Sequence, residues 1–154
     1  MYLHGDGGSH IFCGDGLDSN SEIQPDMSVE QRDSIEEYGK KIIKNSFDII
    51  LTNPPFSMSY DANKPDEKRI MKQYKFTEKS SKEKSSILFL SRYYELLKSG
   101  GEMIIVLDDT VLNGKSLERA RKWISEKFII LSIHSLSFNA FFKAQANIKT
   151  SILH

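Results

Sequence analysis

Residues 47–56 read FDIILTNPPF, a short apolar run followed at once by a polar, proline-rich corner. An apolar run of this length, bounded by Asn-Pro, is typical of a strand buried in a parallel sheet. Open α/β sheets bind their ligands beyond the carboxyl ends of their strands. The corner at residues 53–56 is therefore the first place where we expect chemistry.

The composition bounds the class of protein. The chain has 154 residues, which is enough for one domain with a sizeable core. Lys+Arg and Asp+Glu are both 21, so net charge gives no argument for nucleic acid. Cys13 is the single cysteine, which excludes an internal disulfide and fits a reducing cytoplasm. No apolar run approaches the ~18 residues of a membrane span, and residues 1–5 do not begin a signal peptide, so we expect no membrane partner.

The rest of the chain alternates between helical and strand patterns. Ser28, with Gln31 three residues later, predicts a capping box at the start of a helix. Helices are predicted over residues 28–44, 86–97 and 116–126, and strands over 10–13, 47–51, 102–107, 128–133 and 148–153. Residues 57–86 show no clean period and indicate an exposed, charged segment. This order predicts an α/β fold with a mostly parallel sheet and a C-terminal antiparallel hairpin.

The corner offers four distinct chemical groups. Asn53 has a carboxamide oxygen and an NH2 group. Pro54 and Pro55 fix the backbone and lack N–H groups, which leaves carbonyls that can accept. Phe56 offers a flat apolar face. Together they suit a planar ligand with an amino group, held by the Asn53 oxygen and the Pro54 carbonyl and stacked on Phe56. The alternative is a strand that ends in a proline turn with a core phenylalanine.

This tetrapeptide resembles the catalytic motif of N6-adenine DNA methyltransferases. More narrowly, the chain is similar to the modification subunits of type I restriction systems and to related fused restriction-modification enzymes. Residues 1–5 (MYLHG) followed by 14–17 (GDGL) resemble the stretch before their catalytic motif. Residues 97–101 (LKSGG), 105–107 (IVL) and 111–112 (VL) resemble their "LKPGG…IVLP…VL" segment, and residues 151–153 match a closing strand. The resemblance implies a Rossmann-like, S-adenosylmethionine-dependent fold that methylates a flipped adenine, with Asn53, Pro54, Pro55 and Phe56 as the catalytic residues.

One stretch of the sequence matches the methyl-donor motif but lies at the wrong spacing. Residues 12–16 (FCGDG) spell F-x-G-x-G, the form of the donor loop. In the implied fold, however, that loop follows the first strand and the corner follows the fourth, and residues 17–46 are too few for the elements between. The better match is the loop after the third strand, so the resemblance assigns donor contacts to Asp15 and Gly16, together with Asn53. The alternative for Asp15 is a turn residue between glycines.

The same spacing implies that part of the fold is missing. We expect residues 1–154 to be the carboxyl-terminal part of one catalytic domain, without the first two strands and the donor loop, and inactive alone. The apolar edge at Ile49 and Leu51 would then lack its neighbour, which predicts a partner strand, an adjusted sheet order or poor solubility. The partners that the resemblance implies are DNA, the missing amino-terminal part, and specificity and restriction subunits or domains.

Further candidates lie outside the corner. A basic stretch follows it, where the family's variable loop lies near the flipped base; the alternative is a solvated loop whose acids offset the lysines. Asp109 either lines the site or makes a turn. The four histidines lack ligand spacing, so we predict no metal. Rival functions are a non-catalytic remnant or interaction module, and methylation of a protein glutamine, whose similar corner usually ends in Tyr. The predicted DNA contacts are Lys64, Lys68, Arg69, Lys72 and Lys75.

Overall fold

The chain divides into two compact units, Met1–Ile43 and Lys44–His154. The computed structural model describes residues 12, 15–19, 23, 25–56, 58–77, 80–141 and 148–154. The strand predicted over residues 10–13 therefore lies outside the described residues, apart from Phe12. None of the helices in the described part combines the length and hydropathy that crossing a bilayer requires.

The first unit contains one helix, α1 (Val29–Lys41). Its start confirms the predicted capping box: the Gln31 N–H donates to Ser28 Oγ at 3.3 Å, and the Ser28 N–H donates to Gln31 Oε1 at 2.9 Å. Arg32 fastens the preceding loop by donating to the Pro25 carbonyl at 2.7 Å. The helix begins as predicted and ends three residues before the predicted Lys44, because Ile42 has left helical geometry.

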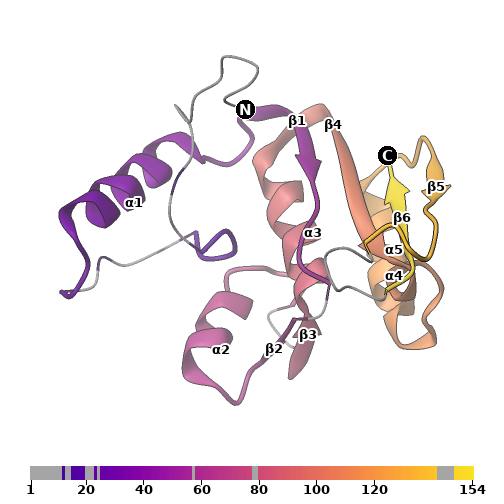
Figure 1. Ribbon diagram of the computed structural model, residues 1–154, viewed down its shortest axis with the longest axis horizontal. Helices are drawn as coiled ribbons and strands as arrows, with labels where there is room; N and C mark the ends of the chain where they lie inside the picture. Colours follow the sequence, from indigo (N-terminus) through magenta and orange to yellow (C-terminus); the bar gives the residue numbers. More distant parts are fainter. Residues whose placement is uncertain are drawn as a thin grey trace. The chain divides into compact units, whose positions relative to one another are not determined.

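The second unit is built on a four-stranded sheet in the order β1-β4-β6-β5 (Figure 1). Its strands are β1 (Phe47–Thr52), β4 (Leu97–Asp108), β5 (Ile133–Ser135) and β6 (Thr150–Leu153). The α/β fold and the antiparallel C-terminal pair are confirmed. The sheet is mixed rather than mostly parallel, however, because only β1 and β4 run parallel, whereas β6 lies antiparallel to both β4 and β5.

The strand predicted over residues 128–133 is mostly irregular. Leu131 and Ser132 both donate to the His154 carbonyl, at 2.7 and 3.0 Å, so the ladder with β6 begins only at Ile133. Ile129 is 88% exposed, which shows that this apolar run lacks the cover that a buried strand needs.

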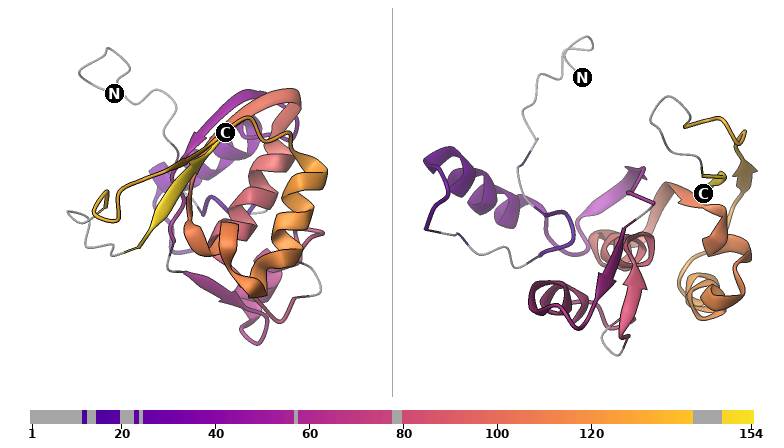
Figure 2. Two further views of the ribbon diagram at one scale, coloured as in Figure 1. Left: turned by 90° about the vertical axis from the view of Figure 1, so that its right-hand side faces the viewer. Right: turned by 60° about the horizontal axis from the view of Figure 1, so that its bottom comes forward.

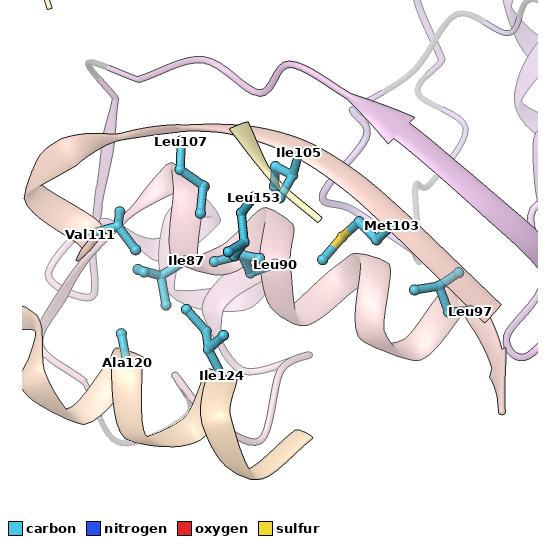
Figure 3. Packing of buried hydrophobic residues seen from close by; sticks show 10 residues of the cluster. All are labelled: Ile87, Leu90, Leu97, Met103, Ile105, Leu107, Val111, Ala120, Ile124 and Leu153. Carbon is cyan, nitrogen blue, oxygen red and sulfur yellow. The ribbon is translucent and has the colours of Figure 1, made fainter. Parts of the chain in front are cut away.

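Helices cover one face of the sheet. They are α3 (Ser85–Leu96), α4 (Asp109–Asn113) and α5 (Glu118–Lys127), with a 3-10 turn, η2 (Lys115–Leu117), before the last. Figure 2 shows α3 and α5 side by side over this face. Alternate residues of β4 point into the core (Figure 3), where they meet both helices. The core residues are Ile87, Leu90, Leu97, Met103, Ile105, Leu107, Val111, Ala120, Ile124 and Leu153.

The opposite face is apolar and exposed in the described residues. Ile49 and Leu51 of β1 are 61% and 72% exposed, and Ile104, which is paired with Leu51 in the ladder, is 37% exposed. Within the described sheet β1 has β4 as its single neighbour, so it forms an edge as the sequence predicts. The order of the strands is not adjusted to cover it.

Residues 58–77 and 80–84 contain a small subdomain, in the segment where the sequence shows no clean period. Strands β2 (Ser59–Asp61) and β3 (Lys82–Lys84) pair antiparallel, and α2 (Pro65–Met71) lies in the connection from one strand to the other. Ile70, Met71 and Tyr74 are buried beneath the charged surface. The period was invisible because the helix has seven residues and each strand three.

Candidate active site

The corner follows β1 directly. Asn53 and Pro55 are exposed, Pro54 is buried and Phe56 is half-buried. Because β1 and β4 are parallel, their carboxyl ends meet at one edge of the sheet. In Figure 1 the arrow of β1 points down toward β2 and β3, and the arrow of β4 ends above α4. The predicted catalytic motif therefore lies where α/β sheets place their ligands.

Helix α3 holds the corner at two points. The Ser85 hydroxyl donates to the Pro55 carbonyl at 2.8 Å, and the Ser85 N–H donates to the Met58 carbonyl at 3.0 Å. Two turns further along α3, Tyr93 Oη accepts a 2.6 Å hydrogen bond from the Thr52 hydroxyl. Ser85 is fully buried, so these contacts form a rigid support behind the corner.

This support leaves the predicted ligand-binding groups available. Among the described residues, neither the Asn53 side chain nor the Pro54 carbonyl has a hydrogen-bond partner. Phe56 meets the ring of Phe141 edge-on, with centroids 5.6 Å apart. The arrangement can therefore present two acceptors and an aromatic side chain to a planar amine.

The end of β4 carries an ion pair between a buried acid and a half-buried lysine. Asp108 is 2% exposed, and Lys84 Nζ lies 3.0 Å from its Oδ1. The Thr110 hydroxyl bonds to both groups. Asp109 accepts a 2.7 Å hydrogen bond from the Ser151 hydroxyl. Both acids thus have structural partners, which favours the turn interpretation of Asp109 over a role in the site.

Asp15 forms a local turn in the first unit. Its Oδ1 accepts from the Leu17 N–H at 2.9 Å, and its carbonyl accepts from the Asp18 N–H at 3.0 Å. Asp15 and Gly16 are exposed. This geometry is that of an Asx-turn, the alternative that the sequence left open, and the donor contact stays a prediction.

The predicted DNA-contacting cations surround α2. All five are exposed, and Lys64 is paired with Glu67 at 2.8 Å. The hydrogen bond from Lys64 is the main cause that lowers the pKa of the Glu67 carboxyl, and the hydrogen bond from the Asp61 N–H lowers it further. In turn, the hydrogen bond to Glu67 raises the pKa of Lys64. The subdomain that carries these cations begins just after the corner, since Met58 and Ser85 are hydrogen-bonded at its base.

Sequence reasoning missed Ser85, Tyr93 and Phe141. Ser85 and Tyr93 reach the corner from 30 and 41 residues away, and such contacts leave no local pattern. The aromatic residues at 138, 141 and 142, set in an otherwise polar segment, were a usable signal for Phe141.

Comparison with known proteins places the chain in a family. Residues 10–142 match the family described as Eco57I restriction-modification methylase. The chain belongs to this family. The match covers the corner, the subdomain after it and every strand of the sheet except β6, and it confirms the resemblance to restriction-modification methyltransferases. The search of curated proteins gave no match.

Two solved structures show how the Eco57I-family chain compares in fold. One is assigned as a class I S-adenosylmethionine-dependent methyltransferase from Listeria monocytogenes, with 22% identity, a TM-score of 0.56 and 71% of this chain covered. The other is the methyltransferase subunit of a type I restriction-modification system from Streptococcus thermophilus, with 29% identity, a TM-score of 0.53 and 71% covered. The chain spans 31% and 23% of the length of these two proteins.

Substitution of Ser85 tests the support behind the corner. We expect Ser85→Ala to lower the free energy of unfolding by about 1 kcal/mol, because the Pro55 carbonyl loses its donor. It should also shift the NMR signals of the Asn53 side-chain amide. The matched control is Ser99→Ala, since Ser99 is exposed on β4. Urea denaturation measures the free energy of unfolding of both variants. If the two variants had the same free energy of unfolding and the same Asn53 amide signals, the assignment of Ser85 would be wrong.

Proposed function

We propose that this chain supplies the acceptor side of a DNA adenine-N6 methyltransferase of a restriction-modification system. The observation that carries the proposal is the Asn-Pro-Pro-Phe corner at the carboxyl end of β1, in a chain of a restriction-modification methylase family. Amines, unlike hydroxyls or thiols, present two hydrogens that two neighbouring acceptors can hold at once.

The corner positions the adenine amine. The Asn53 carboxamide oxygen and the Pro54 carbonyl accept the two N6 hydrogens, and Phe56 stacks on the flipped base. This grip turns the nitrogen lone pair out of the ring plane, toward the methyl group. S-adenosylmethionine supplies, when bound, a methyl group on a sulfonium leaving group. Positioning and electrostatic support of the amine are the main catalytic devices, and the surplus N6 proton passes to solvent.

The residues present fit one end of the methyl donor. Asp15 is exposed, and its carboxylate retains acceptor capacity beyond the Leu17 N–H. It can therefore take the adenine amino group of the donor, with the Gly16 backbone against the ring. In the second unit, Asn53 is the proposed donor contact. We assign neither the ribose nor the methionine end to described residues of this chain.

The chain is proposed to be the carboxyl-terminal part of one catalytic domain. The unpaired edge of β1 and the exposed face at Ile49, Leu51 and Ile104 support this, because sheets with parallel pairs are normally covered on both faces. The amino-terminal part of the domain would supply that cover. DNA, contacted by the cations around α2, and specificity and restriction subunits or domains complete the proposed assembly.

Calorimetry with S-adenosylmethionine tests this division. We expect no binding heat from residues 1–154, and binding with a micromolar Kd, about −8 kcal/mol, by the longest open reading frame that contains them. Equal binding by both proteins would overturn the partial-domain proposal. No binding by the longer protein would overturn the use of S-adenosylmethionine.

Product analysis tests the acceptor. The longer protein, incubated with labelled S-adenosylmethionine and genomic DNA, should place the label in N6-methyladenine. Label in glutamine of added protein, with none in DNA, would instead favour the rival glutamine methyltransferase. Donor binding without transfer to either substrate would favour the non-catalytic interaction module.

A further inference from the structure

A groove that no sequence motif marks lies between β3 and the start of α5. It has a volume of about 460 Å³, within the range of small-ligand sites. One wall is β3, with Lys82 and Lys84, together with Ser59 of β2. The other wall is the turn into α5, with Ser116 and Arg119. We call it the hairpin groove.

The hairpin groove is continuous with the corner along the backbone. Ser59 and Lys84 are paired residues at the base of the β2–β3 hairpin. Directly next to them, Ser85 donates to the carbonyls of Met58 and Pro55. A ligand chain that leaves the corner along this hairpin therefore enters the groove.

Positive charge predominates in the groove. Three cations, Lys82, Lys84 and Arg119, line it with one acid, Glu83. Lys84 is paired with Asp108 at 3.0 Å and Arg119 with Glu83 at 3.3 Å, so the uncompensated positive charge is that of Lys82. Arg119 is held in place: its guanidinium lies 4.4 Å from the centroid of the Phe76 ring and donates to Ser80 Oγ at 2.8 Å and Glu83 Oε2 at 3.3 Å. Its orientation is therefore fixed in the free protein, which lowers the entropic cost of binding.

The remaining polar groups also favour an anion. Lys82 is exposed and, among the described residues, makes no ion pair. Helix α5 follows the 3-10 turn η2 directly, its start has no side-chain cap, and its first turn carries one acid, Glu118, which does not line the groove. Ser116, in the turn before the helix, adds a hydroxyl donor.

We propose that the hairpin groove binds the phosphodiester backbone of the DNA strand that carries the target base. This inference rests on the proposed function, which places a flipped base at the corner and the strand that carries it alongside. It adds Lys82, Arg119 and Ser116 to the DNA interface, on the side of the hairpin toward α5. A polyanion of regular spacing suits fixed cations along a wall better than an acidic peptide, whose carboxylates are spaced irregularly.

Fluorescence anisotropy with a labelled oligonucleotide of about 20 nucleotides measures DNA binding by the 154-residue chain and so tests the groove. Lys82→Gln should weaken binding about three- to tenfold at low salt and reduce the slope of log K against log salt by about 1, the signature of one lost phosphate contact. Ser116→Asp, which puts a negative charge in the groove, should weaken binding further. The matched control is Lys122→Gln, the same change at an exposed lysine of α5 outside the groove.

The outcomes separate this inference from the proposed function. Equal effects of Lys82→Gln and Lys122→Gln, or no binding of DNA by the chain at about 50 mM salt, would overturn the groove. Poly-glutamate that binds in a Lys82-dependent manner, while DNA does not, would assign the groove to an acidic protein and also overturn it. Lys82-dependent binding of DNA, with no methyl transfer by the longer protein, would support the groove while the proposed function fails.

Discussion

Replacement of Asn53 by alanine is expected to lower the rate of adenine methylation by the longer protein about 10²- to 10³-fold. This is the usual effect of removing one preorganised hydrogen-bonding group that acts on a developing charge. The amide oxygen has no competing partner among the described residues, so it is free to accept from the amine. The loss should fall on kcat, because stacking on Phe56 and the phosphate contacts still hold the DNA.

The control for this experiment is Asn63→Ala. Asn63 is also exposed, in the turn before α2, and its hydrogen bond to Asp61 uses the backbone N–H. Methylation should therefore change less than twofold. Quantitative mass spectrometry of N6-methyladenine gives both rates. An Asn53→Ala variant that methylates DNA as fast as the control would remove the corner from the mechanism.

Much of the fold could be predicted because its determinants are local. The Ser28–Gln31 capping box identified the start of α1, and the apolar run 103–107 identified β4. The segment at residues 128–132 shows the limit of this reasoning. Its apolar residues suit a strand, yet a strand also needs a ladder partner, and the His154 carbonyl at the end of β6 receives two N–H groups at once. Whether a segment finds a ladder partner depends on another part of the chain and cannot be predicted from the segment alone.

The site divides in the same way. The corner is four consecutive residues, so its chemistry could be inferred from the sequence alone. Its support by Ser85 and Tyr93 depends on how α3 packs against β1, and a serine and a tyrosine on an apolar helix carry no motif. The hairpin groove likewise joins residues 59, 82–84 and 116–119, which only the folded chain brings together.

The largest loss of stability is expected from Ile105→Ala. Ile105 is fully buried at the centre of β4, between β1 and β6, and belongs to the core that α3 and α5 cover. Removing its side chain should lower the free energy of unfolding of the 154-residue chain by about 2–5 kcal/mol, because transfer energy is lost and a cavity remains. Urea denaturation followed by circular dichroism measures this change.

Ile104→Ala is both the control and the sharper test. Ile104 is the preceding residue of the same strand, with an equal side chain on the opposite, 37% exposed face. In the isolated chain its truncation should cost well under the Ile105 value, about 1 kcal/mol or less. If the amino-terminal part of the domain covers this face, the same substitution should cost about 2 kcal/mol or more in the longer protein. If Ile104→Ala lowers the free energy of unfolding by the same amount in the longer protein, the face at Ile49, Leu51 and Ile104 is exposed to solvent there too. The partial-domain proposal would then fail.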